Sequence, residues 1–303
     1  MAPTCMQDYI QLTRLHKFPL GSAVIFWPAA YGVAMAAYAF DISAGALVRQ
    51  TASFAVGCTL LHSTFCVLND IFDRDLDGLV GEFSGAVSVP GAYALFFTFL
   101  LATVAPLFFS NKQAIIIGLL SVPLHVLYPL SKRWTWWPQA WLGMSNAWSF
   151  FVGWFAIAAN RSTREQVLAV FSAYAAMICW TIYFDTVYAT QDREDDARVG
   201  VKSTARLFGA WLWEITACFA LAAVALLVYA GYLADHGVAY YAVACGGALA
   251  HFIWQLTSWD IDSEKSSGKI FKSNGELGLI IFIGVVADYA LKGTSFPAMP
   301  TPV

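Results

Sequence analysis

Residues 69–77 read Asn-Asp-Ile-Phe-Asp-Arg-Asp-Leu-Asp, and they follow directly on a long apolar run. On a helix, Asp70, Asp73 and Asp77 fall at i, i+3 and i+7 and therefore share one face, with Asn69 beside them. Like charges on one face repel, so a cation is expected between them. Mg²⁺ is the best candidate because it takes carboxylate oxygens and shares its remaining positions with phosphate.

A second acidic segment, Gln-Asp-Arg-Glu-Asp-Asp at residues 191–196, follows another apolar run. Asp192 and Asp196 are an i, i+4 pair, and Asp185 precedes Asp192 by two helical turns on the same predicted helix face. Two acidic helix faces at a membrane suggest an enzyme that ionises a lipid diphosphate. A charged rim without a ligand is the alternative, and it is disfavoured because carboxylates at membrane depth are costly and usually functional.

The composition is that of an integral membrane protein, with 59% hydrophobic and only 12% charged residues among 303. Soluble domains carry about a quarter charged residues. Nine apolar runs reach about the 20 residues that a transmembrane helix needs. No linker or polar domain interrupts them, so residues 1–303 are expected to form one all-α transmembrane domain. The runs cover residues 19–39, 48–69, 87–109, 113–131, 137–159, 167–190, 208–232, 236–257 and 276–294.

The basic residues predict the orientation of these helices in the membrane. If the N-terminus is cytosolic, the cytosolic loops hold 12 of the 17 Lys and Arg residues and the opposite loops hold 5. Positive loops stay inside, so the N-terminus and both acidic segments are expected on the cytosolic side, where the two segments face one another. The first residues do not read as a cleaved targeting peptide.

Other site classes are excluded. A net charge of −3 argues against a nucleic-acid surface. The six Cys show no paired spacing and the five His no HExxH-type spacing, so neither a disulfide framework nor a zinc site is expected.

Several residues near the acidic segments are candidates for contact with the substrates. Lys132 and Arg133 end the segment 128–133, and each serves either as a topology signal or as a diphosphate contact. Lys202 follows the second acidic segment, and Arg14 and Lys17 precede the first apolar run. The tyrosines Tyr128 and Tyr188 lie close to the basic and acidic segments in the sequence.

Four segments together resemble the UbiA-type intramembrane prenyltransferases, and within them the fungal branch that prenylates aromatic or polyketide acceptors. The resemblance runs nearly end to end and is strongest over residues 183–204. It implies nine helices around a central cavity, with Mg²⁺ bound by Asn69 and the five aspartates of the two motifs. The other segments that carry it are 14–21, 128–143 and 254–274, of which the last looks like the family's final cytosolic loop.

The resemblance also implies the chemistry. A prenyl group, expected to be farnesyl, passes from a prenyl diphosphate to a lipophilic aromatic acceptor in secondary metabolism. Lys132, Arg133 and Lys202 compensate the charge of the departing diphosphate, and Asp185 orients the acceptor hydroxyl or takes a proton. Arg14, Lys17, Tyr128 and Tyr188 are expected to contact the substrates. Eukaryotic relatives are expected in the endoplasmic reticulum.

The chain departs from the family in residues 78–86. There the family has a basic stretch, whereas this chain has none and carries Glu82. This departure keeps a second hypothesis open, a membrane terpene cyclase that ionises farnesyl diphosphate without an acceptor. A third hypothesis is a cation-binding transporter, which predicts acids near the bilayer midplane rather than at helix ends.

Overall fold

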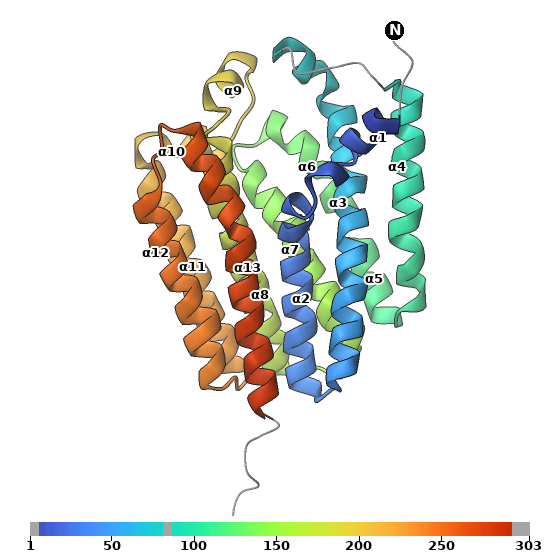
Figure 1. Ribbon diagram of the computed structural model, residues 1–303, viewed down its shortest axis with the longest axis vertical. Helices are drawn as coiled ribbons and strands as arrows, with labels where there is room; N and C mark the ends of the chain where they lie inside the picture. The colour runs from blue at the N-terminus through green and yellow to red at the C-terminus, as the bar shows by residue number, and fades with distance from the viewer. Residues whose placement is uncertain (1–5, 81–86, 293–303) are drawn as a thin grey trace, which may run out of the picture.

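The computed structural model describes residues 6–80 and 87–292, and for Leu20 and residues 74–80 the backbone alone. The described chain is helical and contains no β-strand. Its long helices run up and down one bundle (Figure 1). Seven stretches in it are long and apolar enough to cross a membrane. They belong to α2 (Leu20–Phe40), α3 (Ala44–Val80), α4 with η2 (Val89–Val104, Ala105–Phe109), α5 with α6 (Lys112–Leu120, Val122–Trp134), α8 (Arg164–Ala189), α10–α11 (Thr204–Phe208, Leu212–Leu233, joined by η3, Gly209–Trp211) and α13 (Glu264–Lys292).

The other two predicted apolar runs also form helices, α7 (Pro138–Ala158) and the π-helix η4 (Tyr240–Cys245) continued by α12 (Gly246–Ser258). Neither is among the seven candidate spans of the described chain. α7 can be less apolar than the candidate spans because several of its polar side chains are buried and hydrogen-bonded inside the protein. The Ser149 hydroxyl, for example, donates to the Ile25 carbonyl over 2.8 Å.

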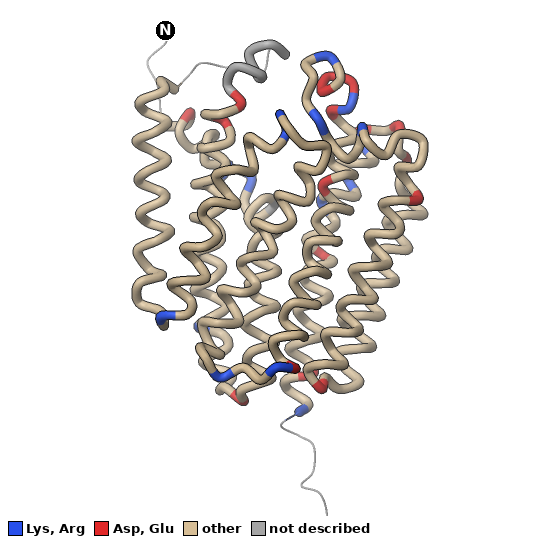
Figure 2. Tube along the Cα trace, turned by 180° about the vertical axis from the view of Figure 1, so that it is seen from behind, with Lys and Arg blue, Asp and Glu red and all other residues tan. Residues whose placement is uncertain are grey.

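Three short elements lie at the end of the bundle where α3 finishes (Figure 1). They are α1 (Met6–Leu12), η1 (Leu15–Lys17) and α9 (Arg193–Val199). Charged residues gather at the two ends of the bundle and are sparse between them, as Figure 2 shows. Both acidic segments are therefore at the same end of the molecule as the N-terminal elements, as the sequence predicts.

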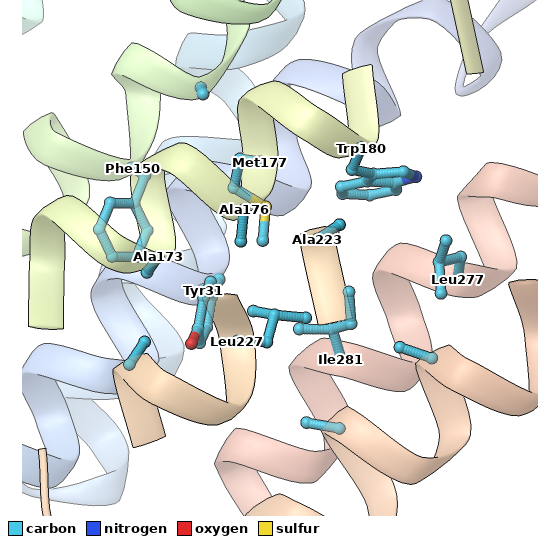
Figure 3. Close-up of a cluster of buried hydrophobic side chains, with 14 of the residues drawn as sticks. Tyr31, Phe150, Ala173, Ala176, Met177, Trp180, Ala223, Leu227, Leu277 and Ile281 are labelled. Carbon is cyan, nitrogen blue, oxygen red and sulfur yellow. The ribbon is translucent and has the colours of Figure 1, made fainter. Parts of the chain in front are cut away.

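The packed core lies where α2, α7, α8, α11 and α13 meet, and small side chains let these helices approach closely. In Figure 3, Ala173 and Ala176 lie near the larger Tyr31 and Phe150, and Ala223 lies near Trp180. Glycines have the same effect between α2 and α7. A Cβ atom at Gly153 would come within 2.5 Å of the Ala29 carbonyl oxygen.

A cavity of about 220 Å³ lies to one side of this core, between α3, α4, α5, α6 and α7. Phe54, Cys58, Leu61 and Phe65 line it from α3, at the i, i+4, i+7 and i+11 positions of one helix face. Asn69 continues the same row of positions. The apolar face of α3 that lines the cavity thus leads to the acidic segment.

α13 begins well before the predicted apolar run, so residues 264–274 are helix rather than loop. The segment is polar in sequence, but Ser267, Ser273 and Asn274 are buried. The Asn274 side-chain oxygen accepts a hydrogen bond from the Trp180 indole over 2.8 Å. The prediction of a final loop over 254–274 is therefore wrong except for residues 259–263, because internal bonds replace water for these polar groups.

Candidate active site

The first acidic segment lies on α3 and is helical through Asp77, as predicted. Asp73 is its most buried described carboxylate, with a side chain 7% exposed. One oxygen, Oδ2, accepts from the Asn69 amide over 2.8 Å and from the Lys132 ammonium over 3.0 Å. The other oxygen, Oδ1, is buried and has no hydrogen-bond partner among the described residues. The side chain of Asp77 lies outside the described residues.

A second ion pair joins this segment to the N-terminal elements. The Arg14 guanidinium donates to Asp70 Oδ1 over 2.8 Å and to the Gln11 carbonyl over 3.0 Å. Among the described residues, Arg133, next to Lys132, pairs with no carboxylate, and its guanidinium donates to the backbone carbonyl of Phe72 over 2.7 Å. Three cations from two segments far from α3 in the sequence therefore contact one turn of that helix.

The second acidic segment is not a continuation of α8, as the sequence prediction assumed. α8 ends at Ala189, and Asp192 precedes the first residue of the separate helix α9. Asp196 is still one turn from Asp192, because its N–H donates to the Asp192 carbonyl over 2.8 Å. The predicted shared face of Asp185 and Asp192 is wrong, since no continuous helix joins them.

The residues 190–203 that carry this segment are held by contacts that the sequence reading missed. The Arg206 guanidinium donates to the carbonyls of Asp196 and Val201 and lies over the Trp136 ring at 5.3 Å. Gly200 ends α9 with a φ of 77°, a left-handed conformation that favours glycine and turns the chain back. Arg206 therefore positions the second acidic segment without belonging to it.

Behind this segment, a buried amide fixes the start of α10. The Gln139 side-chain oxygen accepts from the Thr204 N–H over 3.0 Å, and Thr186 and Thr204 share a 2.6 Å hydroxyl contact. The buried Gln139 and Thr204 come from α7 and α10, so three helices meet at this point. In the sequence, the one sign of this contact is the polar Gln139 at the otherwise apolar start of α7.

The two acidic segments meet around Lys132. α9 contacts α3, and the charge of Lys132 acts on Asp73, Asp185 and Asp196 alike. Burial, and next the neighbouring Asp192, raise the pKa of Asp196 to about 6. Asp185 is half-buried near Tyr128, on whose hydroxyl its charge acts. The structure thus brings together the predicted residues Asp70, Asp73, Asp185, Asp196, Lys132 and Tyr128.

Three predicted residues lie at the margin of this group. Within the described residues, the Lys202 ammonium reaches the Trp134 carbonyl at 3.5 Å and no carboxylate. The Tyr188 ring is 44% exposed and packs against Phe271 at 4.7 Å between ring centroids. Lys17 is exposed in η1.

The donor set suits a hard divalent cation. Carboxylate and amide oxygens are what Mg²⁺ takes, and Asp73 Oδ1 is a buried oxygen with no partner in the described part of the chain. Among the described side chains, no three His, Cys, Asp or Glu groups converge on one point as they stand. Asp70 and Asp73 are each paired with a protein cation instead.

The profile of the UbiA prenyltransferase family matches residues 25–282, which include both acidic segments. The chain belongs to this family. A relative named UbiA prenyltransferase claS, from Ampulloclitocybe clavipes, is 39% identical over 293 residues, covering 94% of this chain and 92% of that protein. The Caenorhabditis elegans mitochondrial 4-hydroxybenzoate polyprenyltransferase is 35% identical, over 96% of this chain and 81% of its own length.

Solved structures agree on the fold of this UbiA-type prenyltransferase. A UbiA homologue from Aeropyrum pernix K1 superposes with a TM-score of 0.72 at 22% identity, covering 89% of this chain and 98% of that one. A homologue from Archaeoglobus fulgidus, solved bound to GPP and Mg²⁺, gives 0.65 at 17% identity, covering 93% and 99%. The helical arrangement is therefore shared with these proteins.

Proposed function

We propose that this UbiA-type prenyltransferase moves a prenyl group, farnesyl in our expectation, from a prenyl diphosphate to a carbon of an aromatic or polyketide acceptor, with Mg²⁺ as cofactor. The observation that carries the proposal is the free, buried Oδ1 of Asp73 among further carboxylates. A buried oxygen without a partner is unfavourable unless a ligand completes it. The Archaeoglobus fulgidus homologue, which binds GPP and Mg²⁺, supports this ligand class.

The two acidic segments would hold the metal and, through it, the diphosphate. When bound, Mg²⁺ neutralises the diphosphate and makes it a better leaving group. The proposed ligands are Asn69, Asp70, Asp73, Asp77, Asp192 and Asp196.

The remaining steps fall to the side chains around Lys132. As the allylic C–O bond breaks, its electron pair leaves with the diphosphate, and Lys132, Arg133 and Lys202 balance that charge. A carbon of the acceptor ring then forms the new C–C bond with the allylic cation. The ring proton displaced at that carbon passes to Asp185, a half-buried carboxylate whose charge acts on the Tyr128 hydroxyl. Arg14, Lys17, Tyr128 and Tyr188 remain the proposed substrate contacts.

The prenyl chain would extend from the acidic segment into the cavity between α3 and α7. From Asn69 to Phe54 the helix rises about 22 Å, enough for several isoprene units. The wall there is mostly apolar, with Leu61 and Phe65 nearest the acids. An apolar cavity whose wall on α3 ends one helical turn before Asn69 suits a prenyl tail.

We also propose that α7 and η4–α12 cross the membrane together with the seven candidate spans, giving nine crossings with a cytosolic acidic end. The excess of basic residues at that end supports the orientation. An endoplasmic reticulum location is the expectation, while the mitochondrial names of several relatives make mitochondria the alternative. Cell fractionation distinguishes the two.

The test uses full-length protein in detergent micelles with Mg²⁺ and farnesyl diphosphate, with and without 4-hydroxybenzoate or orsellinic acid. Mass spectrometry should find a prenylated aromatic product that disappears with EDTA. Asp73→Ala should lose about a hundredfold or more of the rate. Glu264→Ala, which removes an exposed acid at the same end of the bundle, is the matched control and should retain it.

Two other outcomes would contradict the transferase. A cyclic hydrocarbon formed without any acceptor would make the protein a terpene cyclase, which the missing basic stretch of residues 78–86 favours. Failure to release diphosphate from geranyl, farnesyl or geranylgeranyl diphosphate would reject both enzymes.

A further inference from the structure

We propose that Arg14 and Lys132 are exchangeable counter-ions, which hold Asp70 and Asp73 in the metal-free protein and release them when metal and diphosphate bind. The inference rests on the proposed function. It goes beyond that function because it makes metal binding and diphosphate binding depend on each other through two named side chains.

The contacts show that these cations occupy oxygens that a metal would need. Arg14 bonds Asp70 Oδ1 at 2.8 Å, and Lys132 bonds Asp73 Oδ2 at 3.0 Å. Only Asp73 Oδ1 is left buried and unbonded on that carboxylate. A divalent ion bound by both aspartates would therefore meet an ammonium and a guanidinium at its own ligands.

Burial explains why these two carboxylates need positively charged partners. The Asp73 side chain is 7% exposed and that of Asp70 is 20% exposed. A buried carboxylate without a positive partner is strongly unfavourable. Two protein cations supply that partner in the absence of metal and hold the carboxylates in place.

The same two cations are able to move. Arg14 belongs to the short N-terminal elements, and its side chain is 35% exposed. The Lys132 side chain is 28% exposed, and its ammonium is carried by a flexible chain of four methylene groups. Neither would have to break the packed core between α2, α7, α8, α11 and α13 in order to turn away from its aspartate.

Release of these cations is favourable only if they find a new anion. A diphosphate brought by the metal is such an anion, and it would lie beside the carboxylates that the cations have just left. A metal ion that binds alone must therefore break two ion pairs and leaves both protein cations without a new anionic partner. Metal together with diphosphate replaces both, so the two ligands should bind cooperatively.

The test measures metal binding to full-length protein in detergent without any prenyl substrate. The probe is Mn²⁺, which suits carboxylate ligands and whose free concentration is read by electron paramagnetic resonance. Arg14→Gln and Lys132→Gln should each bind Mn²⁺ alone about tenfold more tightly than the unmodified protein. Lys132→Arg keeps the charge and should change little. Lys265→Gln, which removes an exposed cation at the same end, is the matched control.

A second readout measures the retention of labelled inorganic pyrophosphate at saturating Mn²⁺. Here Arg14→Gln and Lys132→Gln should bind about tenfold more weakly. If the two cations had only a structural role, their loss would weaken the binding of both Mn²⁺ and pyrophosphate. Exchange predicts instead that Mn²⁺ binds more tightly and pyrophosphate more weakly.

Each outcome decides a separate question. Unchanged or weaker Mn²⁺ binding in the Gln variants would overturn the exchange and leave the proposed function standing. Unmodified protein that retains no pyrophosphate with Mn²⁺ would reject the proposed function itself. If Lys132→Gln does not fold, the more exposed Arg14→Gln carries the test alone.

Discussion

The backbone N–H of Lys202 donates to the carbonyl oxygen of Lys132 over 3.1 Å. This bond joins the chain that follows α9 to the last turn of α6. The side chain of Lys132 meanwhile reaches Asp73 on α3. Lys132 thus supports the second acidic segment through its backbone and pairs with the first segment through its side chain. Displacement of residues 190–203 should therefore disturb both segments.

Arg206→Met should lower the rate of prenyl transfer about 10- to 100-fold without unfolding the protein. The change removes the bonds to the carbonyls of Asp196 and Val201 that hold the second acidic segment. Hydrogen exchange of residues 190–203 should increase, which separates a loosened loop from a lost substrate contact. Arg198→Met is the control, because Arg198 pairs only with exposed acids on α9 itself among its described contacts. Equal losses in the two variants would argue against a positioning role.

Gly57→Phe should shorten the prenyl chain that the protein accepts. Gly57 lines the cavity, and a Cβ atom there would meet nothing within 4 Å, so a phenyl ring can enter the open space. Turnover of geranylgeranyl and farnesyl diphosphate should fall at least about tenfold relative to geranyl diphosphate. Val56→Phe, at a residue of α3 that is 64% exposed, should not change this ratio. An unchanged preference in Gly57→Phe would place the tail elsewhere.

Gly153→Val should destabilise the bundle by about 1–3 kcal/mol or more, because the added atoms collide with backbone. At this position a Cβ would come within 2.5 Å of the Ala29 carbonyl oxygen, and α2 cannot yield without losing its packing against α7. Thermal unfolding in detergent measures the effect. Gly275→Val makes the same chemical change where no atom lies within 4 Å of the new Cβ. A similar loss in both variants would point to helix propensity instead.

The stability of the bundle should fall as the pH drops below about 6.5, and His236 should account for part of the fall. Its ring lies between Tyr38 and Tyr240, with Nδ1 2.9 Å from Asp288. Burial lowers the pKa of His236, an effect that Asp288 opposes and Lys292 reinforces. The unfolded chain therefore binds the proton first, which costs up to about 1.4 kcal/mol per pH unit.

Thermal unfolding between pH 8 and pH 5 checks this dependence. His236→Phe keeps a ring between the two tyrosines and should flatten the slope, although the protein is less stable at every pH. The exposed His16 provides the control as His16→Gln, which should leave the slope unchanged. A slope that persists in His236→Phe would assign the effect to other groups.

Periodicity and charge predicted the parts of this fold that depend on contact with lipid or water. The seven candidate spans, the division between α6 and α7, and the common end of the acidic segments are all confirmed. The sequence predicts α7 as an apolar run but does not show which of its polar side chains are buried. Its buried polar groups, such as Ser149, depend on partners from other helices, and no local pattern reveals those partners.

The candidate site was also predictable only in part. The acidic residues stand out because charge is rare in an apolar chain, but their partners Arg14 and Lys132 are joined to them only by the tertiary fold. Arg206 reads as an ordinary basic residue at a membrane surface, and only its bonds to backbone carbonyls reveal its role. Gly200 is a local signal for the end of α9, whereas residues 190–192 between α8 and α9 include no glycine or proline that would have marked the break.

The cavity between α3 and α7 reaches the outer surface of the bundle, where Ser53 and Leu119 of its wall are exposed. A tail lodged there would remain in contact with lipid while its diphosphate is at the acidic end. The concentration that governs turnover is then the mole fraction of the donor in the bilayer, not its molarity in water. Dilution of the donor with inert lipid or detergent at constant volume should slow the reaction, and the prenylated product would enter the membrane without passing through water.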